Sequence, residues 1–183
     1  MAGATTEAGG FVLVVGPSGA GKDTLIRIAR GRLAGQSRFV FPRRLVTRAP
    51  SADEDNAEIA EDAFARGAAS GAFALSWRAH GLGYALPGET VVQAEAGRIV
   101  VGNVSRGVVA AARESLPRVS VVAVTASAPV LAQRLAARGR LGDGDLALRL
   151  SRSADAEADC TILNEGAPED AADRLVAHLL SRR

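Results

Sequence analysis

The sequence predicts an α/β domain in which helices flank a largely parallel sheet. Three observations support this fold class. Short apolar runs alternate with segments of helical spacing, two of these runs are apolar almost throughout, and a glycine-rich turn joins the first run to a helix. Strands alternating with helices are typical of βαβ units. Almost uninterrupted apolar strands are typical of a parallel sheet covered on both faces.

The predicted elements follow in order along the chain. We expect strands at residues 11–15, 39–46, 73–77, 99–102, 119–125 and 160–163. We expect helices at residues 23–33, 59–69, 88–97, 105–116, 127–138 and 168–181. The acidic residues 49–58 lack apolar anchors and predict a loop. Residues 139–144 contain three glycines, a composition typical of a hinge, and a short helix is predicted at 145–153.

Composition limits the classes of function. The 183 residues suffice for one domain with a sizeable core. A net charge of +2 without a long basic tract argues against nucleic acid and membranes as partners. The single cysteine, Cys160, excludes an internal disulfide and fits a reducing compartment, so we expect the cytoplasm. The first apolar run is too short for a signal segment or a membrane span. The oligomeric state is left open, a homodimer included.

A phosphate-binding loop follows the first predicted strand. Glycines let consecutive backbone N–H groups turn toward phosphate oxygens, and the helix that follows adds its positive N-terminal end. Lys22, the only lysine among 22 lysines and arginines, places a mobile ammonium beside the β- and γ-phosphates. This pattern is typical of P-loop nucleotide-binding proteins. The predicted ATP site comprises Gly16, Pro17, Ser18, Gly19, Ala20, Gly21, Lys22, Asp23 and Thr24.

Asp23 departs from the usual motif, which has Ser or Thr after the lysine to contact Mg²⁺. Two interpretations stay open. Asp23 helps to hold Mg²⁺, directly or through water, or it is a first-turn acid that the helix dipole favours. We expect ATP and Mg²⁺ as cofactors, with Asp23 as the candidate metal ligand.

Arginines gather in two places. Arg43, Arg44 and Arg48 lie at the end of the second predicted strand. The glycine hinge is flanked by Arg134, Arg138, Arg140, Arg149 and Arg152. Guanidinium groups stabilise the charge of a moving phosphoryl group, and a mobile lid excludes water. We expect Arg134, Arg138 and Arg149 to act in catalysis with Lys22, against the alternative of a solvated face.

The sequence offers no convincing general base. Its two histidines are His80 and His178, and His178 is expected on the surface of the last helix. A phosphate acceptor needs no base, because its second pKa of about 6 leaves the oxygen anionic at neutral pH. The absence therefore favours a phosphate acceptor over a hydroxyl acceptor.

Motifs along nearly the whole chain resemble the guanylate-kinase scaffold. They are Gly16 to Lys22, Thr47-Arg48-x-Pro50, Glu54, Phe64, Gly71-x-Phe73, Gly81-x-x-Tyr84, Arg134-x3-Arg138-Gly139 and Leu163-Asn164. The resemblance implies a nucleoside-monophosphate-kinase-like core at 11–42, 98–138 and 154–183. It also implies an acceptor-binding insert at about 43–87 and a mobile lid at about 138–152. Arg48, Glu54 and Tyr84 would face the acceptor, and Asn164 would lie near adenine.

The positions that read guanine in guanylate kinases differ here. Leu75 stands in place of a glutamate, Gly102-Asn103 in place of paired aspartates, and Ser51 in place of an arginine. A pocket without those carboxylates cannot read the hydrogen-bonding edge of guanine in the same way.

The same segments resemble the ribose 1,5-bisphosphate phosphokinases. Their pattern includes Gly-Pro-Ser-Gly-Ala-Gly-Lys-Asp, Arg43-Arg44-x2-Thr47-Arg48, the run 71–82 and Asn103-x-Ser105-Arg106. That family phosphorylates the 1-phosphate of ribose 1,5-bisphosphate to 5-phosphoribosyl 1-diphosphate, late in a route of phosphonate breakdown. The implied acceptor residues are Arg43, Arg44, Arg48, Glu54, Trp77, His80, Tyr84, Asn103, Ser105 and Arg106.

Three points stay open for these residues. Trp77 fits either a sugar-phosphate pocket, together with Arg78, or plain core packing. His80 either forms a hydrogen bond with the acceptor or has only a structural role in a turn. Asn56 stands where family members usually carry histidine, and we assign it no role.

The resemblances leave two alternatives to the bisphosphate kinase. The first is a guanylate-type nucleoside monophosphate kinase. The second is a non-catalytic guanylate-kinase-like binding module, although such modules tend to lose the phosphate loop, which is intact here.

Overall fold

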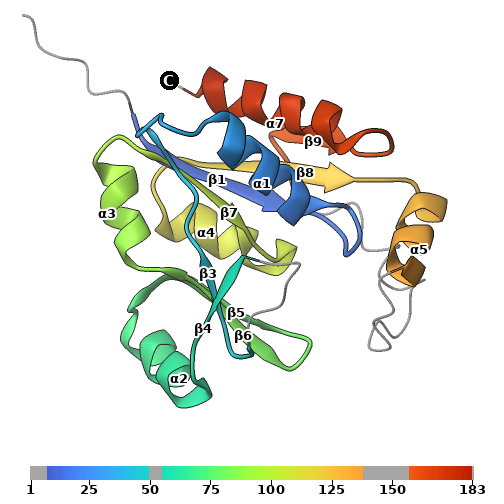
Figure 1. Ribbon diagram of the computed structural model, residues 1–183. Helices are drawn as coiled ribbons and strands as arrows, with labels where there is room; N and C mark the ends of the chain where they lie inside the picture. The colour runs from blue at the N-terminus through green and yellow to red at the C-terminus, as the bar shows by residue number, and fades with distance from the viewer. Residues whose placement is uncertain (1–7, 50–54, 138–156, 183) are drawn as a thin grey trace, which may run out of the picture.

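The computed structural model describes residues 8–49, 55–137 and 157–182, and these residues form two sheets (Figure 1). The larger sheet has five strands in the order β2-β7-β1-β8-β9, and every neighbouring pair is parallel. The smaller sheet has four strands in the order β4-β3-β6-β5. The predicted α/β architecture with a parallel sheet is confirmed.

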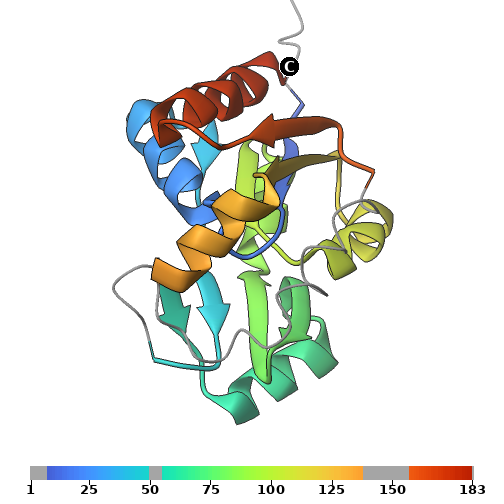
Figure 2. The same cartoon turned by 90° about the vertical axis from the view of Figure 1, so that its right-hand side faces the viewer.

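Helices cover both faces of the five-stranded sheet. Its strands are β1 (Gly10–Val15), β2 (Phe39–Val40), β7 (Ile99–Asn103), β8 (Val119–Thr125) and β9 (Cys160–Leu163). Its helices are α1 (Lys22–Arg32), α3 (Glu89–Glu95), α4 (Val109–Ser115, after a 3-10 turn at Arg106–Val108), α5 (Ala128–Ala137) and α7 (Pro168–Ser181). Helices α1 and α7 pack on one face and α3 and α4 on the other, while α5 lies beside the turn between β1 and α1 (Figures 1 and 2).

The fully buried strand β1 divides the core into two apolar layers. Successive side chains of a strand point to opposite faces. Val12 and Val14 therefore pack in the layer under α1 and α7, whereas Phe11, Leu13 and Val15 pack in the layer under α3 and α4. This burial on both faces explains the uninterrupted apolar run in the sequence.

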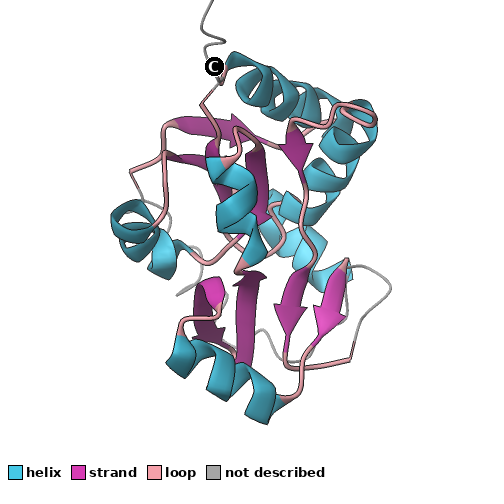
Figure 3. Cartoon of the chain, turned by 90° about the vertical axis from the view of Figure 1, so that its left-hand side faces the viewer, coloured by secondary structure: helices cyan, strands magenta, loops and turns pink. Residues whose placement is uncertain are grey.

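The four-stranded sheet lies below the larger one and carries helix α2 on its outer face (Figure 3). Its elements are β3 (Arg44–Val46), β4 (Asn56–Glu58), α2 (Glu61–Ser70), β5 (Phe73–Ala79) and β6 (Leu82–Pro87). Phe64 of α2 stacks on Phe73, with ring centroids 5.8 Å apart. On the other side of this sheet, Leu75 and Leu86 join the α3–α4 layer of the core.

Two predictions about strands were wrong. Residues 39–46 do not form one strand but two, β2 and β3, which belong to different sheets. Pro42 stands between them and has no N–H to donate to a ladder. The predicted loop 49–58 contains β4, which pairs in parallel with β3. Because β4 has only three residues and carries no apolar run, its sequence gives no strand signal.

Two further differences concern a hairpin and a histidine. Strand β6 was not predicted, although His80-Gly81 connects it to β5 as a two-residue turn with positive φ at both positions. His178 is half-buried rather than on the surface, and its Nε2 lies 3.0 Å from Ser120 Oγ. Burial lowers the pKa of His178, and the positive charge of Arg182 lowers it further.

No helix among the described residues is long and apolar enough to cross a membrane.

Candidate active site

The phosphate loop, residues 16–21, connects the carboxyl end of β1 to the start of α1. β1 is the central strand, and the chain after it leads to β2 at one edge of the sheet, whereas the chain after its neighbour β8 leads to β9 at the other edge. Ligands of α/β proteins bind at such a switch point. Gly16 has a φ of 147°, and a Cβ there would lie 2.0 Å from the Val124 carbonyl oxygen of β8. Only glycine therefore lets the loop turn this close to the neighbouring strand.

The lone lysine lies inside this loop. Lys22 Nζ donates to the carbonyl oxygens of Gly16 at 2.8 Å and Pro17 at 3.1 Å. As the first residue of α1, Lys22 also stands at the positive end of the helix. The ammonium and the helix end together favour an anion at the mouth of the loop.

Asn164 braces the loop from the protein interior. Its side chain is 3% exposed, and its Nδ2 donates to the Ala20 carbonyl oxygen at 2.8 Å. A Cβ at Gly21 would lie 2.5 Å from the same nitrogen. The Asn164 Oδ1 atom is buried and has no hydrogen-bond partner among the residues that the structure describes. The structure therefore places Asn164 against the loop backbone, and its contact with adenine stays a prediction.

Arg134 extends from α5 toward the loop, and its NH1 lies 3.5 Å from the Gly19 carbonyl oxygen (Figure 2 shows α5 beside the loop). Glu165 approaches the same helix, where its carboxylate accepts a hydrogen bond of 2.7 Å from the Ser127 N–H. Hydrogen bonds from Ser127 lower the pKa of Glu165, and the charge of Arg134 adds to this shift. Among the predicted catalytic arginines, Arg138 and Arg149 lie outside the described residues.

Asp23 is exposed on the first turn of α1 and accepts a hydrogen bond of 2.7 Å from Asn103 Nδ2. Asn103 ends β7, so this contact joins the first turn of α1 to the carboxyl end of β7 beside the loop. The Asp23 carboxylate and the Thr24 hydroxyl are oxygen donors of the kind that Mg²⁺ takes. No group of three or more His, Cys, Asp or Glu residues in the described part of the chain could hold a metal.

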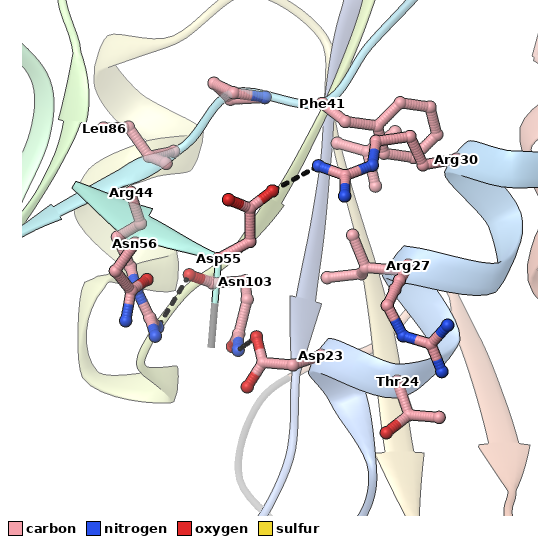
Figure 4. A pocket seen from close by; sticks show the side chains of 13 residues that line it. Asp23, Thr24, Arg27, Arg30, Phe41, Arg44, Asp55, Asn56, Leu86 and Asn103 are labelled. Carbon is pink, nitrogen blue, oxygen red and sulfur yellow. Dashed lines mark hydrogen bonds and ion pairs between the residues drawn. The ribbon is translucent and has the colours of Figure 1, made fainter. Parts of the chain in front are cut away.

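A pocket of about 650 Å³, counted with its open mouth, lies between α1 and the smaller sheet (Figure 4). Its lining is mixed: apolar side chains form the floor, and charged and amide groups stand around it. The lining residues are Asp23, Thr24, Ile26, Arg27, Arg30, Phe41, Pro42, Arg44, Asp55, Asn56, Leu86, Val101 and Asn103. Because Asp23 and Asn103 border both, the pocket adjoins the phosphate loop directly.

Arg44 is held in the pocket by polar and aromatic groups. Its Nε donates to Asn56 Oδ1 at 3.2 Å, and its NH1 donates to the Asn103 carbonyl oxygen at 3.4 Å. Its guanidinium lies over the Tyr84 ring, 5.1 Å from the centroid, and Tyr84 stacks on Trp77 at 5.6 Å. Trp77 also packs against the core, which favours its structural role behind Tyr84 and Arg44.

Sequence reasoning missed the α1 side of the pocket and the start of β4. Arg30 and Arg43 both form ion pairs with Asp55, and the Arg43 Nε to Asp55 Oδ1 distance is 2.9 Å. The hydrogen bond from Arg30 lowers the pKa of Asp55, and the charge of Arg43 contributes. Helical spacing could have revealed Arg30 and Arg27, since both follow Asp23 on one face of α1.

Asn56, to which we assigned no role, is also central to the pocket. It is 5% exposed, and Arg43 donates to its carbonyl oxygen at 2.7 Å while Arg44 donates to its side chain. It therefore positions two arginines.

Other predicted acceptor residues lie farther along the smaller sheet or at its border. Arg78 pairs with Glu61 and lies over the Phe64 ring of α2, on the face opposite Trp77, so its predicted place in the pocket was wrong. His80 is exposed in the hairpin turn, which favours the turn interpretation. Ser105 caps the 3-10 turn by accepting from the Gly107 N–H at 3.3 Å.

Arg48 and Arg106 are half-buried, and their roles stay predictions, as does that of Glu54, which lies outside the described residues.

Comparisons with known proteins identify the family. No family model matches the sequence. A ribose 1,5-bisphosphate phosphokinase of Methylobacterium radiotolerans is 67% identical over 171 residues, which make up 93% of this chain and 97% of that protein. The chain belongs to the ribose 1,5-bisphosphate phosphokinase family. Phosphokinases of the same name from Bradyrhizobium diazoefficiens and Acidiphilium cryptum are 54% and 50% identical over 92% and 97% of the chain. The matches span 86% and 96% of those two proteins.

Solved structures place this phosphokinase chain among P-loop kinase folds. The guanylate kinase of Anaplasma phagocytophilum superposes with a TM-score of 0.71 at 19% identity, over 96% of this chain and 86% of its own. A sugar kinase of Janibacter sp. gives a TM-score of 0.52 at 18% identity, over 94% of both chains. At these identities the likeness shows the fold alone.

The phosphokinase pocket differs from the guanylate-kinase pattern where guanine would be read. Leu75 is 7% exposed and packs in one apolar layer with Leu86. A Cβ at Gly102 would lie 3.1 Å from Leu86 Cδ1, so a longer side chain there would displace Leu86. Asn103 binds Asp23. Ser51 lies outside the described residues.

Proposed function

We propose that this chain transfers the γ-phosphate of ATP to the 1-phosphate of ribose 1,5-bisphosphate, giving 5-phosphoribosyl 1-diphosphate and ADP. One observation carries the proposal beyond the family relationship. The phosphate loop adjoins a pocket that presents arginines, while the positions that read guanine in guanylate kinases hold Leu75, Gly102 and Asn103. Such a pocket suits a doubly phosphorylated sugar and leaves a purine base without hydrogen-bond partners.

The acceptor supplies its own nucleophile. An oxygen of the 1-phosphate, anionic near neutral pH because its second pKa is about 6, attacks the γ-phosphorus. A new P–O bond forms as the bond from the γ-phosphorus to the β-γ bridging oxygen breaks, and ADP leaves with that electron pair. No proton has to be removed from the acceptor, which agrees with the exposed turn position of His80 and the remote position of His178.

Groups around the phosphate loop would stabilise the charge on the moving phosphoryl group. Lys22 Nζ lies among the loop carbonyls, and Arg134 reaches Gly19 from α5. Arg138 and Arg149 are proposed to add to this charge from a lid at about 138–152.

Magnesium is proposed as the metal cofactor, with Asp23 contributing an oxygen. When bound, Mg²⁺ would neutralise charge on the β- and γ-phosphates. The Asn103 amide, which donates to Asp23 at 2.7 Å, keeps one carboxylate oxygen engaged and orients the other. The interaction of Asp23 with the helix dipole is compatible with this role.

Acceptor binding is proposed for the pocket and its border, with residues from an insert at about 43–87 and from the end of β7 and the turn that follows it. The residues proposed to contact or shape the acceptor site are Arg43, Arg44, Arg48, Glu54, Tyr84, Asn103, Ser105 and Arg106. Trp77 is proposed to act through Tyr84. We also propose that the reaction serves phosphonate breakdown in the cytoplasm, as the family resemblance and the single cysteine suggest.

An acceptor screen tests the proposal. ADP release is measured with ribose 1,5-bisphosphate and with GMP at saturating ATP and Mg²⁺. The account predicts a kcat/KM for the bisphosphate that exceeds the value for GMP by about three orders of magnitude or more, because a purine leaves several polar groups unpaired. Equal efficiencies would establish a guanylate-type kinase instead. Absence of ATP binding in calorimetry would support the non-catalytic module.

A further inference from the structure

A carboxylate lies between two arginines at the end of the pocket farther from the phosphate loop. Asp55 forms an ion pair with Arg30 of α1 through one oxygen and with Arg43, ahead of β3, through the other (Figure 4 shows the first contact). All three side chains are about half exposed. Arg30 and Asp55 line the pocket, and Arg43 joins them through its ion pair with Asp55, so this half-exposed cluster can exchange one anion for another.

The cluster lies at a distance that suits the second phosphate of a pentose bisphosphate. Lys22 begins α1 beside the loop, and Arg30 lies eight residues later, about 12 Å along the helix axis. The acceptor must fit one phosphate next to the γ-phosphate of ATP and then a sugar ring. Its other phosphate consequently reaches the part of the pocket that Arg30 lines.

Additional positive charge surrounds this end of the pocket. Arg27 lies one turn before Arg30 on the same face of α1 and lines the pocket. Within the described residues, Arg27 makes no hydrogen bond or ion pair, so it can contact a ligand without losing a partner. With Arg30 and Arg43 paired to Asp55 and Arg27 one turn away on α1, positive charge exceeds negative charge at this end of the pocket, which favours a dianion over Asp55.

We propose that Arg30 and Arg43 form the subsite for the 5-phosphate of the acceptor, with Arg27 beside them, and that Asp55 occupies this subsite as an internal counterion until the phosphate displaces it. This inference rests on the proposed function. It goes further in assigning specificity for a second phosphate to α1, an element that otherwise serves ATP. A phosphate accepts more hydrogen bonds from two arginine forks than a carboxylate does, so the exchange is favourable.

The first experiment uses Arg30→Gln and compares two monophosphates as competitive inhibitors of bisphosphate turnover. Ribose 5-phosphate carries only the phosphate that the subsite should bind, and ribose 1-phosphate carries only the other. The variant should raise the inhibition constant of ribose 5-phosphate about tenfold or more and change that of ribose 1-phosphate less than about twofold. Arg66→Gln, which removes an exposed arginine from an ion pair on α2, is the matched control and should change neither.

The outcomes separate the subsite from the function. A wild-type protein that does not phosphorylate ribose 1,5-bisphosphate would contradict the proposed function itself. A wild-type protein that does so, with an Arg30→Gln variant that weakens both monophosphates equally, would overturn the subsite and leave the function standing. Arg30 is exposed, so loss of folding is not expected, and an unchanged unfolding temperature verifies this.

The second experiment tests the counterion. Asp55→Asn removes the competing charge and should lower the inhibition constant of ribose 5-phosphate by about threefold or more, with Asp62→Asn on α2 as the matched control. A higher inhibition constant in Asp55→Asn would show that Asp55 supports the arginines rather than occupying the place of the phosphate, and would overturn its assigned role.

Discussion

At the residue scale, Lys22 combines two properties that no other side chain of the protein shares. It is the only lysine, and it lies within the phosphate loop, bound to two loop carbonyl oxygens. Lys22→Ala should lower kcat at least about a hundredfold, because the charge nearest to the transferred phosphoryl group is lost. Steady-state kinetics measure the effect, and circular dichroism melting controls for folding. Turnover close to normal in the folded variant would remove the loop from the mechanism.

The role of Asp23 can be assigned from the Mg²⁺ dependence of the activity. If it helps to hold Mg²⁺, Asp23→Asn should raise the Mg²⁺ concentration for half-maximal activity by about tenfold, more than it raises the KM for ATP at saturating metal. The substitution is nearly isosteric and keeps an oxygen that can accept from Asn103, so the local geometry should persist. An unchanged Mg²⁺ requirement would leave the helix-dipole interpretation.

Single residues also show how much of the site could be predicted from the sequence. The phosphate loop could be predicted because the spacing of its glycines and lysine follows from the way backbone N–H groups surround phosphate oxygens. The contact of Asn164 with the loop backbone was not expected from the sequence, and Asn56 was given no role but binds two arginines. Such contacts join positions far apart in the chain, so local patterns do not encode them.

At the element scale, the approach of β1 to β8 depends on Gly16. An alanine Cβ there would lie 2.0 Å from the Val124 carbonyl, and the backbone φ is 147°. Gly16→Ala should therefore lower the free energy of unfolding by more than about 2 kcal/mol. Gly31→Ala in α1 is the control, since nothing lies within 4 Å of its Cβ. That change should raise stability by about 0.5–1 kcal/mol. Urea denaturation of both variants measures the difference, and equal stabilities would contradict the steric argument.

The contact between α7 and β8 should make stability depend on pH through His178. Burial and the charge of Arg182 hold the pKa of His178 below its ordinary value of 6.5, although Asp159 opposes the shift. The unfolded state therefore binds the proton more readily than the folded state. The stability that the neutral imidazole preserves is fully present above pH 6.5 and is lost as the pH falls below that value.

The variant His178→Gln isolates this effect. Between about pH 7.5 and about pH 5.5, the melting temperature of the wild type should fall more than that of the variant, because carboxylates titrate in both but the imidazole only in one. Parallel melts by circular dichroism provide the measurement. Equal losses in the two proteins would show that His178 does not link folding to protons.

Elements with a strong hydrophobic periodicity could be predicted from the sequence, and elements with a weak periodicity could not. The last helix begins and ends at Pro168 and Ser181 as expected, since it has proline at its start and a regular apolar stripe. Strands β4 and β6 were missed because the first has three residues and the second contains Gly83 and Pro87. Their pairing partners, rather than their own residues, stabilise them as strands.

At the scale of the whole molecule, the two sheets bring together the elements that we propose to bind ATP and the acceptor. The parallel sheet supplies the loop, α1 and Asn103, and the smaller sheet supplies Arg44 and Asn56. The sequence assigned the acceptor to residues of the predicted insert and to Asn103, Ser105 and Arg106, but not to α1. The structure adds α1 to the pocket, because Asp23, Arg27 and Arg30 of the helix that follows the loop line it (Figure 4).

Phosphorus NMR of the reaction products tests the central claim most directly. The protein is incubated with ATP, Mg²⁺ and ribose 1,5-bisphosphate, and spectra are recorded as ATP is consumed. The account predicts a new pair of coupled diphosphate signals beside those of ADP, while the 5-phosphate signal remains a monoester. The pair should not form with the Lys22→Ala variant. Formation of ADP and inorganic phosphate alone, or of GDP from added GMP with equal efficiency, would contradict the account.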